Sequence, residues 1–144
     1  MLKKALPWVL AIVPAIVFLQ TLPFKFTGHP MTQHIFSTIG DWFSSLGLAP
    51  LDTFFTHAGA YVIGAFEALA AIALLIPSRR HYGALLGTAL LAGAIFFHIA
   101  TPLGIAVQFP GEDAPDSSLF LLAVAAFACC LTLVLMNVRR FRGE

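Results

Sequence analysis

The chain has 144 residues, of which 59% are hydrophobic and only 10% are charged, and its formal net charge is +1. Soluble domains carry about 25% charged residues, and a soluble chain of this size would leave much of so large an apolar surface facing water. The composition therefore excludes an ordinary soluble domain and indicates that lipid is part of the solvent. Lys and Arg are too few to form a basic face, so a nucleic-acid-binding protein is excluded as well.

Four apolar runs are each long enough to cross a membrane as a helix, which takes roughly 20 residues. The first contains Pro7 and Pro14, which transmembrane helices tolerate when their neighbours satisfy the freed carbonyl groups. A short basic turn at residues 78–81 separates the second run from the third, so we expect an antiparallel hairpin. The runs cover about residues 5–26, 58–77, 82–101 and 118–137. They predict an all-α integral membrane four-helix bundle that forms one transmembrane domain.

The two longer connections differ in character. Residues 29–57 carry Ile, Phe, Trp and Leu at helical spacing, which predicts a short amphipathic helix at the membrane interface in the first outer loop. Residues 102–117 contain Pro, Gly and all of Glu112, Asp113 and Asp116. This composition predicts an exposed loop.

Basic residues predict the orientation, because Lys and Arg accumulate in cytoplasmic segments near the ends of spans. All of them except Lys25 lie before the first run, between the second and third, or after the fourth: Lys3, Lys4, Arg79, Arg80, Arg139, Arg140 and Arg142. We therefore expect both termini in the cytoplasm and the two longer connections outside. A cleaved signal peptide is the competing interpretation of the first run, but no small-residue cleavage pattern follows residues 20–25.

Small residues predict where the helices touch each other. Gly83 and Gly87 lie four positions apart, and such pairs let transmembrane backbones approach closely. We expect this pair to face the second run, which the tight turn brings near. Cys129 and Cys130 are adjacent in the fourth run, where a mutual disulfide would be strained, so we expect both to be packing residues.

Three ionisable side chains lie within the predicted spans or at their ends, where each needs a partner or a water-filled cavity. Glu67 lies in the middle of the second span, Lys25 ends the first, and His98 lies near the outer end of the third. Small residues on the Glu67 face of its helix indicate that this side chain points into the bundle. We therefore predict a ligand-binding or relay site made of Lys25, Glu67 and His98, without a metal.

Each of these residues also has a purely structural interpretation. Lys25 can extend to the outer headgroups, His98 can bond a backbone carbonyl, and an unpaired Glu67 can stay protonated. The remaining histidines and acidic residues of the outer loops are candidates for a metal site, although their spacing matches no familiar ligand set. They are His29, His34, His57, Asp41, Asp52 and Asp113.

Several short motifs occur in the order found in a known family of membrane proteins. They are Phe24-Lys25-Phe26-Thr27-Gly28, Phe36-Ser37-Thr38-Ile39-Gly40, Glu67 in an apolar run, Gly93-Ala94-Ile95-Phe96-Phe97-His98, Leu103-Gly104-Ile105 and Ser118-Leu119-Phe120. With these residues the chain resembles the DoxX-like family of small four-helix membrane proteins. The resemblance implies a location in the bacterial inner membrane, and some relatives are described as subunits associated with quinol oxidation or with thiol and sulfur redox chemistry.

Three functions stay open from the sequence. The first, which we prefer, is an accessory subunit or small-ligand-binding bundle in redox metabolism, with a quinone as the candidate cofactor and a membrane or periplasmic redox protein as the candidate partner. The second is a small proton-coupled transporter that uses Glu67 and His98 as a relay. The third is a non-catalytic assembly or chaperone-like protein whose polar residues lock the helices together. No metal, flavin, nucleotide or nucleophile motif is present, so whether the chain is an enzyme also stays open.

The predicted topology can be tested with reporter fusions. A reporter fused after Glu144 or near Arg80 should read as cytoplasmic, whereas reporters near Asp52 and Asp113 should read as external, because the basic segments stay inside. A cytoplasmic signal at Asp113 would contradict the arrangement of four spans.

Overall fold

The chain is helical throughout its membrane-spanning part. The computed structural model describes residues 2–142, with side chains described for residues 5–138. Four helices are long and apolar enough to cross a membrane: Ala5–Phe26, Ala49–Leu75, Arg80–Ala100 and Ser118–Val138. The elements in chain order are α1 (Leu2–Phe26), α2 (Pro30–Ser45), α3 (Ala49–Phe54), the π-helix η1 (Phe55–Gly59), α4 (Ala60–Leu75), α5 (Arg80–Ala100) and α6 (Ser118–Arg142). No β-strand forms within residues 2–142, so the prediction of an all-α membrane bundle is confirmed.

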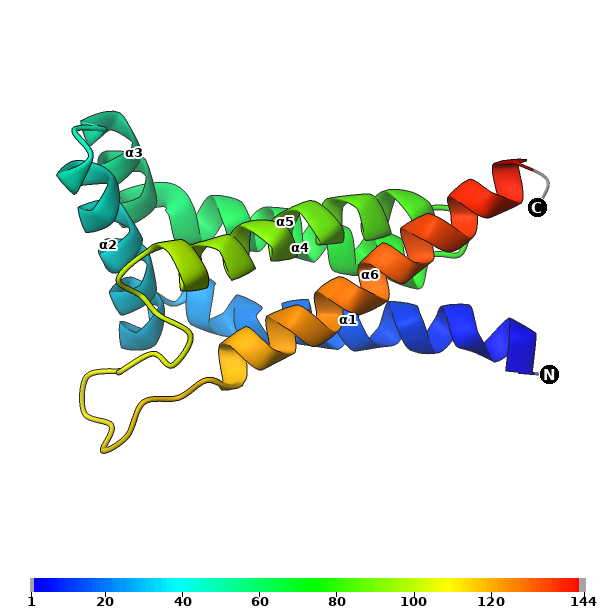
Figure 1. Cartoon of the computed structure of the whole chain (residues 1–144), viewed down its shortest axis with the longest axis horizontal. Helices are drawn as coiled ribbons and strands as arrows, with labels where there is room; N and C mark the ends of the chain where they lie inside the picture. The colour runs from blue at the N-terminus through cyan, green and yellow to red at the C-terminus, as the bar shows by residue number, and fades with distance from the viewer. Residues whose placement is uncertain (1, 143–144) are drawn as a thin grey trace.

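The four long helices lie side by side as a closed bundle (Figure 1). α1 contacts α4 and α6, and α5 contacts the same two helices from the other side. The start of α1 and the end of α6 lie at one end of the bundle, together with the turn from α4 to α5 (Figure 1). We call this the turn end. The opposite end, which we call the cap end, carries α2, α3 and residues 101–117.

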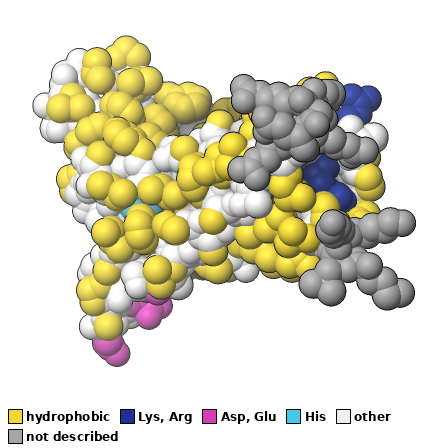
Figure 2. Space-filling view, turned by 45° about the vertical axis from the view of Figure 1, so that its right-hand side comes forward, with side chains coloured by type: hydrophobic (Ala, Val, Ile, Leu, Met, Phe, Trp, Pro, Cys, Tyr) yellow, Lys and Arg dark blue, Asp and Glu magenta, His cyan; other side chains and the backbone are white. Residues whose placement is uncertain are grey.

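Basic and acidic side chains lie at opposite ends of the bundle. On the face drawn in Figure 2, Lys and Arg side chains gather at the turn end and acidic side chains at the cap end, with an apolar surface between them. Such a belt between two polar ends is the surface that a membrane requires. The side chains of Lys3, Lys4, Arg139, Arg140 and Arg142, which contribute to the predicted orientation, lie outside the described residues.

Small residues close the half of the bundle near the turn end. The buried ones include Ala11, Ala15, Ala70, Ala71, Ala84, Ala126 and Cys130. Lipid tails are as apolar as these helices, so close contact between backbones is the main attraction available. Cys130 is fully buried in this cluster, which confirms it as a packing residue, and Cys129 is half-buried.

The glycine pair of α5 divides its contacts between two neighbours. A Cβ atom on Gly83 would lie 2.5 Å from the backbone nitrogen of Leu74, so this glycine packs directly on α4 as predicted. A Cβ atom on Gly87 would instead lie 2.9 Å from the Sγ atom of Cys130 on α6 and 3.3 Å from Phe18 on α1. The prediction that Gly87 faces the second span is therefore wrong. The two glycines share one face of α5, and one helical turn beyond Gly83 the atoms nearest to that face belong to α6 and α1.

A second apolar cluster closes the cap end. It joins Ile39 of α2 to Leu103, Val107 and Phe109, each of which is at most 5% exposed. The prediction of an exposed loop at residues 102–117 is thus wrong for these three side chains. Their burial depends on α2 lying across the bundle end, which the local composition of the loop does not reveal.

Helix α2 has the amphipathic character predicted for the first outer connection. It buries Thr32, Phe36, Ile39 and Gly40 and lies across the ends of the long helices (Figure 1). The second membrane-spanning helix then begins at Ala49, before the predicted start at residue 58, and it includes η1. Polar residues in this early part lower the local hydropathy, so the apolar run begins later than the helix does.

Replacing Gly83 with Ala tests the closest helix contact. Because the new Cβ atom would meet the α4 backbone, which cannot rotate away, Gly83→Ala should lower the free energy of unfolding by about 1 to 3 kcal/mol. Gly93→Ala is the matched control on the same helix, since a Cβ atom there would have no neighbour within 4 Å. Thermal unfolding in detergent should show a lower melting temperature for Gly83→Ala alone, and equal melting temperatures would contradict the contact.

Candidate functional site

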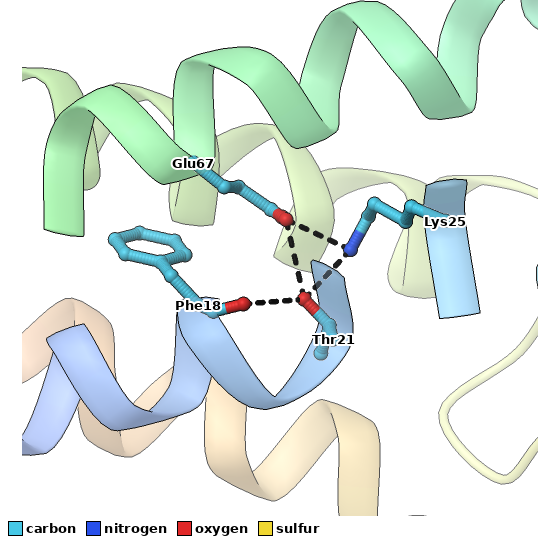
Figure 3. A network of polar contacts seen from close by, with 4 residues as sticks. All are labelled: Phe18, Thr21, Lys25 and Glu67. Atoms are coloured by element: carbon cyan, nitrogen blue, oxygen red, sulfur yellow. Dashed lines mark hydrogen bonds and ion pairs between the residues drawn. The ribbon is translucent and has the colours of Figure 1, made fainter. Parts of the chain in front are cut away.

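An ion pair joins α1 to α4 inside the bundle (Figure 3). The Nζ atom of Lys25 lies 2.8 Å from the Oε2 atom of Glu67, and each side chain is 13% exposed. A charge in this position is costly unless a partner compensates it. The prediction that Glu67 points inward and contacts a polar group of another span is therefore confirmed, with Lys25 as the partner.

Thr21 completes the network between the two charges. Its hydroxyl accepts a hydrogen bond from Lys25 Nζ at 2.9 Å. The same hydroxyl lies 2.9 Å from the carbonyl oxygen of Phe18 and 3.2 Å from Glu67 Oε2, as Figure 3 shows. Because a hydroxyl has one hydrogen, it donates mainly to one of these two oxygens at a time.

The direction of the Lys25 side chain follows from helix geometry. Side chains on a helix lean toward its N-terminus, so a residue meets the one four positions before it on the same face. Thr21 stands four positions before Lys25, and the lysine reaches back over it toward mid-depth (Figure 3). The structural interpretation in which Lys25 extends to the headgroups is therefore wrong. The spacing of Thr21 and Lys25 was the sequence signal for this contact.

His98 does not join the ion pair. Its Nδ1 atom lies 2.7 Å from the carbonyl oxygen of Gly104, a contact that requires the ring proton on Nδ1. Its ring also packs edge-to-face on Phe120, with 5.7 Å between the ring centroids. Gly104 has a φ of +75°, a backbone conformation that glycine adopts readily. His98 is thus a buried histidine whose hydrogen bond to Gly104 holds the segment after α5 in place. This agrees with the structural interpretation in which His98 bonds a backbone carbonyl.

All three predicted residues nevertheless line one cavity in the half of the bundle near the cap end. The cavity has a volume of about 570 Å³ and is lined mainly by residues of α1, α2, α4, α5 and α6, most of them apolar. Its polar lining includes Gln20, Thr21, Lys25, Thr32, Glu67 and His98. An apolar cavity of this size with a few convergent polar groups is the usual form of a small-molecule site.

Residues that line the cavity on the neighbouring helices α1 and α6 are also exposed at the outer surface of the bundle. Phe24 on α1 and Leu122 on α6 both line it, and they are 45% and 38% exposed. Gln20 lines it from the exposed face of α1 as well. From this exposure we infer that the cavity opens between α1 and α6, and we call this the lateral opening. A Gln amide facing hydrocarbon is unfavourable without a polar partner, so Gln20 is a site residue that the sequence analysis missed.

The metal site considered for the outer loops is not assembled. Among the described residues, no group of three or more His, Cys, Asp or Glu side chains is placed so that it could hold a metal ion. His57 Nδ1 instead contacts the carbonyl oxygen of Thr53 at 3.1 Å, and His29 accepts a hydrogen bond from the backbone of Met31. His29 thus caps the start of α2, and His57 bonds a backbone carbonyl within the helix Ala49–Leu75.

The arrangement can orient one polar group inside an apolar space. Lys25 offers N–H donors, Glu67 offers acceptor oxygens, and Thr21 offers both. A carbonyl or hydroxyl oxygen can therefore be held at this point while the rest of a molecule contacts apolar side chains. The chain matches no protein-family model, no curated protein and no solved structure.

A double-mutant cycle tests the ion pair. Glu67→Leu leaves the Lys25 cation without a counter-charge, so it should lower the free energy of unfolding by about 3 to 5 kcal/mol. Adding Lys25→Met should recover most of this loss, because no buried charge then remains. Unfolding of the three variants in mixed micelles measures both effects. If the double variant were as unstable as Glu67→Leu, the two side chains would not be coupled.

Proposed function

We propose that this protein binds a small lipophilic molecule that carries a carbonyl or hydroxyl head, as a quinone does. The observation that carries the proposal is the apolar cavity of about 570 Å³ with Lys25, Glu67 and Thr21 on its wall. The polar groups fit the head of such a molecule, and the apolar wall fits its ring and the start of its tail. A few placed polar groups in an apolar site are sufficient for orientation.

The lateral opening supports a ligand that arrives from the bilayer. A quinone-type molecule is concentrated in the hydrocarbon region, and a gap between α1 and α6 meets it there. Gln20 at this gap can donate to or accept from the head as it passes. A long tail can also stay in the lipid while the head occupies the cavity.

The wider role that we propose follows the resemblance to DoxX-like proteins. The bundle would serve as an accessory subunit of redox metabolism in the bacterial inner membrane, with the turn end in the cytoplasm and the cap end outside. The basic residues Arg79 and Arg80 at the turn end support this orientation. The described residues do not connect His98 to Glu67 by a hydrogen bond, which weakens the alternative of a proton-coupled transporter.

A second candidate is a protein that acts by assembly alone. The ion pair joins α1 to α4, and this contact by itself would stabilise the bundle. The two candidates differ in whether the cavity must stay open, and the following measurement separates them.

Filling the cavity should abolish ligand binding. Ala94 lines the cavity, so Ala94→Trp places an indole ring where the ligand would lie. Protein in nanodiscs should bind a short-chain benzoquinone saturably in equilibrium dialysis, and Ala94→Trp should raise Kd by more than about tenfold. Lys25→Met should raise Kd about tenfold, which corresponds to one lost charged hydrogen bond of about 1.4 kcal/mol.

The control is the same substitution outside the cavity. Ala128 lies on the exposed face of α6 and does not line the cavity, so Ala128→Trp should bind the quinone like the parent. Equal Kd values for the two Trp variants, with both proteins folded, would favour the assembly role and contradict the proposed one.

A further inference from the structure

A second cavity lies at the cap end, beside the first. It has a volume of about 610 Å³ and is formed by residues of α1, α2, η1 and α4 and by two loop positions. Its wall includes several hydrogen-bonding side chains: Gln33, His34, Ser37, Thr56, His57 and Tyr61. We call this cavity the cap vestibule. Its wall is more polar than that of the inner cavity, and together with its place at the bundle end this suits water rather than lipid.

The two cavities share part of their wall. Lys25, Thr32 and Phe36 line both of them, whereas Glu67 lines the inner cavity only. Thr32 and Phe36 are buried on the inner face of α2, at 7% and 8% exposure. These three side chains therefore lie between the cap vestibule and the inner cavity.

We propose that the cap vestibule and the inner cavity form one passage, and that the Lys25–Glu67 ion pair holds it closed. The passage would admit water and small polar solutes from the cap side to the polar end of the inner cavity. A lipophilic ligand could then enter through the lateral opening while its head exchanges protons with water through the vestibule. The proposal of a passage is based on the two cavities and does not require the ligand to be a quinone.

The ion pair suits this closing role because the Lys25 side chain is long and is held at its end. Its Nζ atom is tied to Glu67 at 2.8 Å and to Thr21 at 2.9 Å, and these bonds keep its methylene groups across the shared wall. A Cβ atom on Gly64 would lie 3.3 Å from Lys25 Cδ, so the Lys25 side chain also packs against α4. A ligand head that bonded Glu67 or Lys25 would compete with the pair and loosen the wall.

Thiol labelling tests the passage directly. In Ala94→Cys the new thiol lies in the inner cavity, beyond the shared wall. We expect a membrane-impermeant, positively charged methanethiosulfonate to label it slowly in nanodiscs. Adding Lys25→Ala should raise the labelling rate at least about tenfold. Thr32→Ala removes part of the shared wall and leaves the ion pair in place, and it should also raise the labelling rate. It replaces Lys25→Ala in the test if that variant does not fold.

Two controls define the comparison. Thr38→Ala, on the same helix as Thr32 but lining neither cavity, should leave the labelling rate unchanged. Ser37→Cys, in the vestibule, should react quickly in every background, and the parent chain gives the rate due to Cys129 and Cys130.

The proposal is overturned if Ala94→Cys, with the shared wall intact, is labelled as fast as Ser37→Cys, because the wall would then be open. It is also overturned if both wall variants leave the labelling of Ala94→Cys as slow as before, because no passage would exist. Either result is independent of quinone binding, which the dialysis experiment measures separately.

Discussion

Lipid offers these helices no hydrophobic gain for associating with one another, and this constraint shapes the whole bundle. Where small residues let backbones touch, as at Gly83 against Leu74, dispersion contacts hold the helices together. The half near the turn end packs in this way around buried alanines and Cys130, together with the larger side chains of Leu74 and Leu133. Toward the cap end, larger side chains line a cavity instead. The bundle is therefore tightly packed in the half near the turn end and contains a cavity in the half near the cap end.

The ion pair lies within the hollow half, and its position has two consequences. Lys25 and Glu67 neutralise each other across α1 and α4, so neither charge faces the apolar cavity alone. The same two groups are also the strongest hydrogen-bonding groups that a molecule in the cavity would meet. A pair that stabilises the empty bundle and can bond a ligand is well placed to couple ligand binding to a change in the wall.

The cap end depends on contacts between distant segments. Helix α2 supplies Ile39 and Phe36, while the segment after α5 supplies Leu103, Val107 and Phe109. The backbone groups of Val107 and Asp116 bond each other in both directions at 2.9 Å. Hydrogen bonds from the Ser118 hydroxyl and backbone to the Asp116 carboxylate lower the pKa of Asp116 at the start of α6. Of these residues, Phe36, Ile39 and Leu103 line the inner cavity and bound it toward the cap end.

The sequence alone determined the helical class, the four spans and the inward direction of Glu67, because hydropathy and the cost of a charge in lipid act on each helix separately. It did not identify Thr21, which contacts the Glu67 carboxylate, and it favoured Lys25 or His98 as the partner of Glu67. Only the tertiary structure decided between them, since the choice depends on α1 lying beside α4 and on Gly104 offering its carbonyl to His98. The cavity, the exposed Gln20 and the buried loop residues also required the structure. They arise where several helices meet, and no periodicity within one helix records how far its neighbours stand apart.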